Sequence, residues 1–141
     1  MSTRLEALPH RHVLTLPAMP SAVRTARETA EQTLAEWGIS PRHPAVGPAL
    51  LILGELVTNS VRHAAVLSPQ VTVIYAASED CLAFAVHDRH PYQPPLNALV
   101  TGTGTDGLAT VMELTLALGG TAVVRADADA KGKSIWITLP L

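Results

Sequence analysis

The sequence predicts a single α+β domain with a mostly antiparallel sheet and about three helices. Two observations support this prediction. Apolar residues alternate over 71–77 and recur over 81–86 on either side of a short polar connection, which is typical of a β-hairpin. In three other segments, apolar residues recur at the spacing of a helix. The 141 residues show no internal repeat and no domain boundary, and this length suits one domain.

The amino-terminal part is predicted to hold a tail, a strand and a helix. Residues 1–11 read as a flexible tail, and the domain is expected to occupy 12–141. A short strand over 13–16 is ended by a proline. A helix then begins with Ser21 as its N-cap and stops at Gly38, because glycine readily adopts the conformation that ends helices.

The carboxy-terminal part is predicted to hold the hairpin, a long connection, a helix and two strands. The connection begins near Pro91 and has only weak helix or strand signals for about twenty residues, a loop length that is usually functional. The helix covers 107–118 and ends at a pair of glycines. Strands follow over 122–126 and 134–139, so the predicted element order is βαα-ββ-αββ.

The second helix, over about 45–65, carries the most informative residues of the chain. Glu55, Asn59 and His63 follow one another at intervals of four, and Arg62 lies beside them. Residues at this spacing lie on one face of a helix. An amide oxygen is a hard ligand and a carboxylate can accept a proton, so this pair suits a Mg²⁺–phosphate site.

This polar stripe has two interpretations, a solvated helix face and a site. Apolar residues occupy the opposite face, and Leu51, Ile52 and Leu56 flank the stripe. A helix that is apolar around most of its circumference is expected to be buried on more than one side. We therefore interpret the stripe as a site.

A glycine-rich segment, 102–107, matches the spacing G-x-G-x-x-G of dinucleotide-binding loops. A dehydrogenase is nevertheless disfavoured, because such a domain continues with several strand–helix units and this chain soon ends at Leu141. Two readings stay open. The segment is a lid whose backbone amides contact phosphates, or a plain turn that caps the following helix.

Composition narrows the classes of function. The chain is 48% hydrophobic with a net charge of −2 and no basic cluster, which argues for a folded protein and against nucleic-acid or membrane-surface binding. The single cysteine, Cys81, cannot form an internal disulfide and is expected in the core. No signal peptide or membrane span is visible, so a cytoplasmic protein is expected.

Three signals, taken in order, resemble the GHKL ATP-binding family of histidine kinases, gyrase B and Hsp90. They are Glu-x₃-Asn-x₃-His-Ala on a helix, Asp88 at the end of a strand, and a glycine loop that opens a helix. More closely, the chain resembles the single-domain anti-sigma-factor serine kinases of the RsbW/SpoIIAB-like group. The resemblance implies the Bergerat fold, a two-layer α/β sandwich, with ATP and Mg²⁺ as ligands.

The resemblance also implies roles for the residues of the motif helix. Glu55 would be the general base or would position water during phosphoryl transfer. Asn59 would bind the Mg²⁺ that bridges the phosphates. Arg62 and His63 would border the nucleotide, although His63 suits a packing role equally well.

Downstream, the resemblance implies a base-binding residue and a phosphate-binding loop. Asp88 would accept a hydrogen bond from the adenine amino group, and Ser134 stands where the family usually has the Thr beside that aspartate. Gly104 and Gly107, with Leu108, would form the hinge of the lid and the start of the phosphate-contacting helix.

Two sequence motifs of the family each lack one glycine here. The Asp-x-Gly motif reads Asp88-Arg-His, and the Gly-x-Gly-Leu motif reads Thr-Asp-Gly-Leu108. The resemblance implies an anti-sigma-factor-like serine/threonine kinase that binds a regulatory partner such as a sigma factor and phosphorylates a partner protein, such as an anti-anti-sigma-like domain. It also implies a homodimer. The alternative is a catalytically silent module of the same fold.

One of Arg24 and Arg27, a turn apart on the first helix, would reach the phosphates or the partner.

Overall fold

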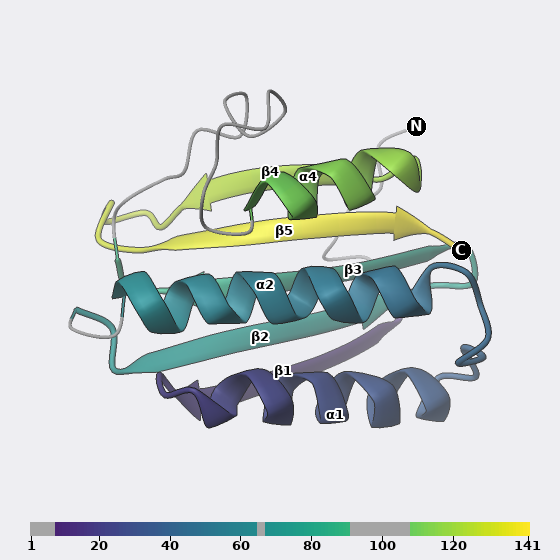
Figure 1. Cartoon of the computed structure of the whole chain (residues 1–141), viewed down its shortest axis with the longest axis horizontal. Helices are drawn as coiled ribbons and strands as arrows, with labels where there is room; N and C mark the ends of the chain where they lie inside the picture. The colour runs from purple at the N-terminus through teal and green to yellow at the C-terminus, as the bar shows by residue number, and fades with distance from the viewer. Residues whose placement is uncertain (1–7, 65–66, 91–107) are drawn as a thin grey trace.

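The computed structural model describes residues 8–64, 67–90 and 108–141 (Figure 1). Within these ranges, five strands form one sheet in the order β1-β2-β3-β5-β4, and every neighbouring pair is antiparallel. The strands are β1 (His10–Pro17), β2 (Gln70–Ala77), β3 (Cys81–Asp88), β4 (Thr121–Ala126) and β5 (Lys133–Pro140). The predicted antiparallel sheet is confirmed, and its pairing differs from the parallel sheet that a dinucleotide-binding domain requires.

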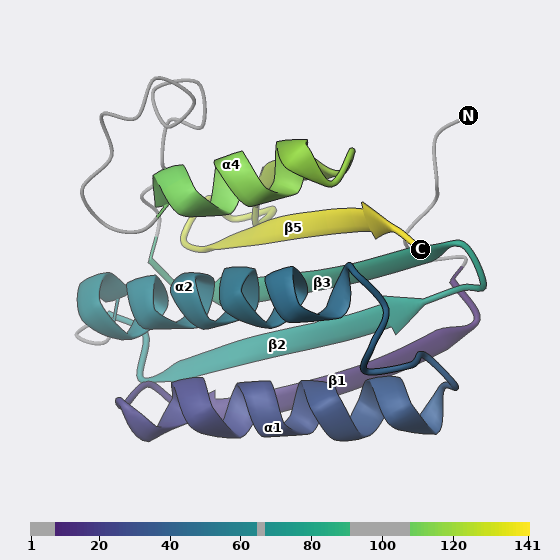
Figure 2. The same ribbon diagram turned by 45° about the vertical axis from the view of Figure 1, so that its right-hand side comes forward.

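Three helices in the described ranges cover one face of this sheet. They are α1 (Ser21–Glu36), α2 (Val46–Ala64) and α4 (Leu108–Ala117). Figures 1 and 2 show α2 between the other two helices, and it makes contacts with both of them and with β3. The two-layer α+β architecture and the expected burial of α2 on more than one side follow from this arrangement.

Alternation along the strands explains the two layers. In β3, Leu82, Phe84 and Val86 belong to the large core cluster that lies against the helices. Ala83 and Ala85 alternate with them and pack in a small cluster on the opposite face of the sheet. Successive side chains of a strand point to opposite faces, so this segment is buried on both sides.

A buried hydrogen bond joins the helix layer to the sheet. The Tyr75 hydroxyl donates to the Ala26 carbonyl oxygen over 2.7 Å, and both residues are almost fully buried. Burial raises the pKa of this phenol. This bond holds α1 against β2 and fixes how close the helix lies to the sheet.

Glycines end two of the helices as the sequence predicts, but the N-cap of α1 was predicted wrongly. Gly38 and Gly119 both have positive φ angles, 77° and 74°, which a residue without Cβ adopts easily.

The sequence predicts Ser21 as the N-cap of α1. Ser21 is instead the first helical residue, and Pro20 is the N-cap without a side-chain hydrogen bond.

Several boundaries differ from the predicted ones by a few residues. β1 begins at His10, inside the expected tail, because residues 10–17 pair along their whole length with β2.

Among the described residues, no helix has the length and apolar character needed to cross a bilayer.

Candidate functional site

The predicted polar stripe lies on α2, and its members are buried to different degrees. Glu55 is half-buried, Asn59 is 9% exposed and Arg62 is exposed. His63 lies in the last turn of the helix, but its side chain is outside the described part of the structure. Asn59 is therefore more buried than Glu55, which precedes it by one turn, and than the exposed Arg62 that follows it.

Asn59 has an unsatisfied side chain. Within the part of the chain that the structure describes, neither its amide nitrogen nor its amide oxygen has a hydrogen-bond partner, although both atoms are buried. A buried polar group without a partner costs about 1–3 kcal/mol, and native structures hold few of them. The free amide oxygen, a hard ligand, fits a bound Mg²⁺, which proteins usually hold through one or two side chains plus phosphate oxygens.

Asp88, the last residue of β3, has the opposite environment. Its carboxylate is 3% exposed and accepts three hydrogen bonds. The Ser60 hydroxyl donates to Oδ2 over 2.8 Å. The His90 backbone N–H donates to Oδ1 over 3.0 Å, and the Lys133 ammonium donates to the same oxygen over 2.8 Å. Ser60 directly follows Asn59, so this network joins the end of β3 to the polar stripe of α2.

Lys133 stands where we expected Ser134. Lys133 is the cross-strand partner of Asp88, whereas Ser134 pairs with His87. Directly paired residues share a face of the sheet, and neighbours along a strand lie on opposite faces. The structure therefore does not bring Ser134 to Asp88, because a shift of one residue along β5 moves its side chain to the far face.

Sequence reasoning missed Ser60 and Lys133. Two signals were available for them. Ser60 directly follows Asn59 in a mostly apolar helix, and Lys133 begins a strand that is otherwise mostly apolar. Neither signal identifies Asp88 as the partner, because the two residues lie 28 and 45 positions from it in the chain.

A second polar cluster surrounds the backbone just beyond Asp88. Arg89 forms ion pairs with Asp127 and with Asp129 of the β4–β5 turn. His87 also contacts Asp127, at 2.9 Å. The hydrogen bond from Arg89 lowers the pKa of Asp129 to about 2, and a backbone N–H from Lys131 contributes. The cluster ties the end of β3 to that turn.

Gly132 allows the turn to approach β3 closely. A Cβ at this position would lie 2.7 Å from the Asp88 carbonyl oxygen and would clash with the Asp127 carboxylate. Gly132 is buried and precedes Lys133 directly. The missing side chain thus allows the lysine to begin β5 beside Asp88.

Only part of the predicted glycine lid can be placed. Gly104 and Gly107 lie outside the described residues. Leu108 is the first described residue of α4 and is 4% exposed, within the core cluster. Asp127, directly after β4, is held by Arg89 and His87.

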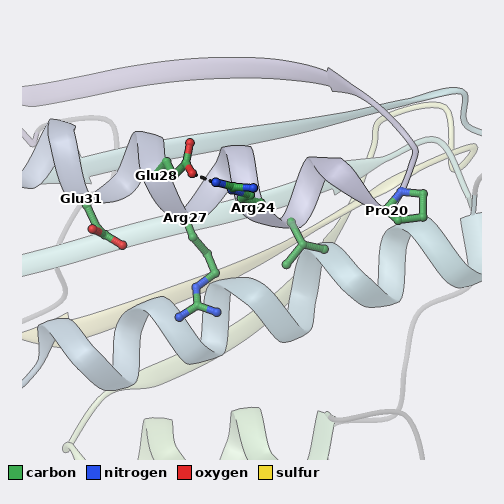
Figure 3. A pocket seen from close by; sticks show the side chains of 6 residues that line it. Pro20, Arg24, Arg27, Glu28 and Glu31 are labelled. Carbon is green, nitrogen blue, oxygen red and sulfur yellow. Dashed lines mark hydrogen bonds and ion pairs between the residues drawn. The ribbon is translucent and has the colours of Figure 1, made fainter.

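The two arginines of α1 differ in direction. Arg24 donates to Glu28 along the same helix over 2.8 Å, whereas Arg27 points from α1 toward α2 (Figure 3). A Cβ on Gly54 would lie 3.5 Å from the Arg27 Cδ. The Arg27 side chain therefore packs against α2 at Gly54, one residue before Glu55. Both arginines line an open hollow of about 380 Å³ along α1.

Structures of known proteins resemble this fold. One is the structure of the RsbU and RsbW domains of Rv1364c from Mycobacterium tuberculosis, with a TM-score of 0.65 and 23% identity over 94% of this chain and 33% of that chain. Another is the histidine kinase domain of a blue-light-activated histidine kinase from Erythrobacter litoralis, with a TM-score of 0.54 and 18% identity over 89% of this chain. This chain spans a third of the first structure and 62% of the second.

At these identities, the two structures establish a shared fold. No curated protein sequence matches the chain. The profile of one family, described as histidine kinase-, DNA gyrase B- and HSP90-like ATPase, matches residues 47–141, which is more than half of the chain. The match includes α2 from its second residue onward and the strands β2, β3, β4 and β5. The chain therefore belongs to the histidine kinase-, DNA gyrase B- and HSP90-like ATPase family.

Proposed function

We propose that this protein binds MgATP and acts as an anti-sigma-factor-like serine/threonine protein kinase. The observation that carries the proposal is the buried, unpartnered amide of Asn59, one helical turn beyond the half-buried Glu55. An amide oxygen left without a donor supports this proposal, because Mg²⁺ prefers hard oxygen ligands. Family membership supports ATP as the nucleotide.

Each residue of the site has a distinct task in this proposal. Asn59 binds the metal ion through its amide oxygen. Bound Mg²⁺ neutralises charge on the phosphates during transfer. Glu55, which is accessible enough to meet an incoming hydroxyl, accepts its proton or orients it. Asp88 accepts a hydrogen bond from the adenine amino group.

The proposed partner is a regulatory protein, a sigma factor or an anti-anti-sigma-like protein with a serine or threonine acceptor. Support comes from the similar structure, which contains an RsbW domain. The other similar structure is a histidine kinase domain. Arg27 and the hollow along α1 offer polar groups for the phosphates or for this partner. A homodimer is part of the same proposal.

A catalytically silent module of the same fold is the second candidate. Two observations favour it. The Asp88 carboxylate already holds three donors. The family's Asp-x-Gly motif also has His90 in place of its glycine. Such a protein would regulate a partner through contact alone.

Calorimetry of MgATP binding tests the first step of the proposal. The wild-type protein should bind ATP in the presence of Mg²⁺, and chelation of the metal should weaken binding. Asn59→Leu should remove this dependence on Mg²⁺. Gln32→Leu, a similar loss of an amide at an exposed position of α1, is the control. Absence of binding at millimolar MgATP would overturn the proposal.

Transfer of the γ-phosphate to candidate partners tests the kinase activity. Glu55→Gln should lower the rate by about 10²–10⁴-fold, the usual contribution of a general base. Partner binding should persist, and Glu36→Gln at the exposed end of α1 should transfer normally. If ATP binds and no partner is modified, the silent module is the better description. If Glu55→Gln transfers at the wild-type rate, Glu55 is not the base.

A further inference from the structure

The ion pair between Lys133 and Asp88 is unusually well buried. The two side chains are 10% and 3% exposed, and Nζ lies 2.8 Å from Oδ1. Lysine and aspartate are seldom buried to this extent, and when they are they occur as pairs. The pair lies on the face of the sheet that carries the helices, at the site where we place the nucleobase.

The number of hydrogen bonds at this pair leaves one position open on each partner. An ionised carboxylate has about four acceptor positions, and an ammonium has three donors. Asp88 uses one position on Oδ2, for Ser60, and two on Oδ1. The Lys133 ammonium points one N–H at Oδ1 and another toward the His90 carbonyl oxygen, at 3.4 Å. With respect to residues 8–64, 67–90 and 108–141, an acceptor position on Oδ2 and a donor on Nζ therefore remain.

We propose that Lys133 determines the base selectivity of the site, so that the protein distinguishes poorly between purines with an amino group and purines with an oxo group at C6. This inference rests on the proposed binding of nucleotide. An amino group donates to the open position of Asp88. An oxo group accepts from the Lys133 ammonium, whereas a carboxylate alone would repel it.

Removal of Lys133 should therefore sharpen selectivity. In Lys133→Met, the carboxylate would keep only the Ser60 hydroxyl and the His90 N–H as donors. A base amino group would then meet an acceptor without competition, and a base oxo group would meet an uncompensated negative charge. A site with one kind of hydrogen-bonding group rejects the mismatched base more strongly than a site with both.

The test compares the dissociation constants of MgATP and MgITP by calorimetry. The wild-type protein should bind the two within about threefold, and Lys133→Met should favour ATP by at least about tenfold. Lys131→Met, which removes the same charge at an exposed position two residues earlier, should keep the wild-type ratio. A ratio measured on one sample does not depend on the folded fraction, and circular dichroism checks the fold.

Lys133→Gln is a second variant for the case in which Lys133→Met does not fold. Its neutral amide still donates, so the ratio should fall between those of wild type and Lys133→Met. The inference is overturned if the wild type already strongly prefers ATP, or if removal of Lys133 leaves the ratio unchanged or lowers it. If none of these proteins binds either nucleotide, the proposed function itself fails. Binding with an unaltered ratio overturns the role of Lys133 alone.

Discussion

Asn59 and Asp88 are two buried polar side chains in one site, and their surroundings are opposite. Among the described residues the Asn59 amide has no partner, whereas the Asp88 carboxylate accepts three hydrogen bonds, one of them from the buried Lys133 ammonium. Ser60 connects the two positions, since it follows Asn59 on α2 and donates to Asp88. The site thus combines an open half, the unpartnered Asn59 on α2, with a hydrogen-bonded half, Asp88 and its donors at the end of β3.

The difference separates the energetic roles of the two halves. A buried polar group without a partner lowers stability until a ligand satisfies it. Asp88, in contrast, contributes to the fold before any ligand arrives, because its removal would leave Lys133 as an unpaired buried charge. Asn59 is therefore the stronger indicator of a ligand, and Asp88 has both a structural and a proposed binding role.

The largest expected effect comes from breaking the hydrogen-bonded half. Asp88→Ala should lower the free energy of unfolding by about 3–5 kcal/mol, because the Lys133 ammonium would stay buried without its partner. Urea denaturation measures the change. Glu79→Ala, in the exposed β2–β3 connection, should change stability by less than about 0.5 kcal/mol. Equal stability of the two variants would contradict a structural role for Asp88.

The close approach of the β4–β5 turn should give the next largest effect. Gly132→Ala should lower the free energy of unfolding by about 1–3 kcal/mol, because the added Cβ would overlap the Asp88 carbonyl oxygen and the Asp127 carboxylate. Gly47→Ala is the matched control, since its added Cβ meets no atom within 4 Å. In a helix, that control should be neutral or more stable. The two variants are compared by thermal and urea unfolding.

The open half should respond in the opposite direction. Asn59→Leu should raise the free energy of unfolding of the ligand-free protein by about 1 kcal/mol, because an apolar side chain replaces an unsatisfied buried amide. Gln32→Leu, on the exposed surface of α1, should change it by less than about 0.5 kcal/mol. A large loss of stability in Asn59→Leu would show that the amide has a partner in solution.

The smallest effect concerns the charged cluster beside Asp88. Arg89 lowers the pKa of Asp129 to about 2 in the folded protein, below the ordinary value of about 3.9. A lowered folded-state pKa stabilises the protein above about pH 4, and this contribution disappears as the pH falls toward 2. The gap in melting temperature between wild type and Asp129→Asn should therefore close over that window. A gap that stays constant down to pH 2 would contradict the ion pair.

Much of the architecture could be predicted because the signals are local. The β2–β3 hairpin, the burial of α2 and the glycines at the ends of α1 and α4 each depend on residues near one another in the chain. The N-cap of α1 could not be predicted in the same way, because both Pro20 and Ser21 suit the start of a helix and a shift of one residue separates them.

The motif residues and their spacing on one helix could be read from the amino-acid order alone, because a helix fixes the relation between positions four apart. The amino-acid order also indicated that Asp88 would end a strand. The lack of a partner for Asn59 among the described residues, and the contact of Lys133 with Asp88 in place of Ser134, depend on how distant segments pack and pair. For Lys133, strand register explains the difference. Alternation assigns neighbouring residues to opposite faces, and the pairing of distant strands decides which of them faces the site.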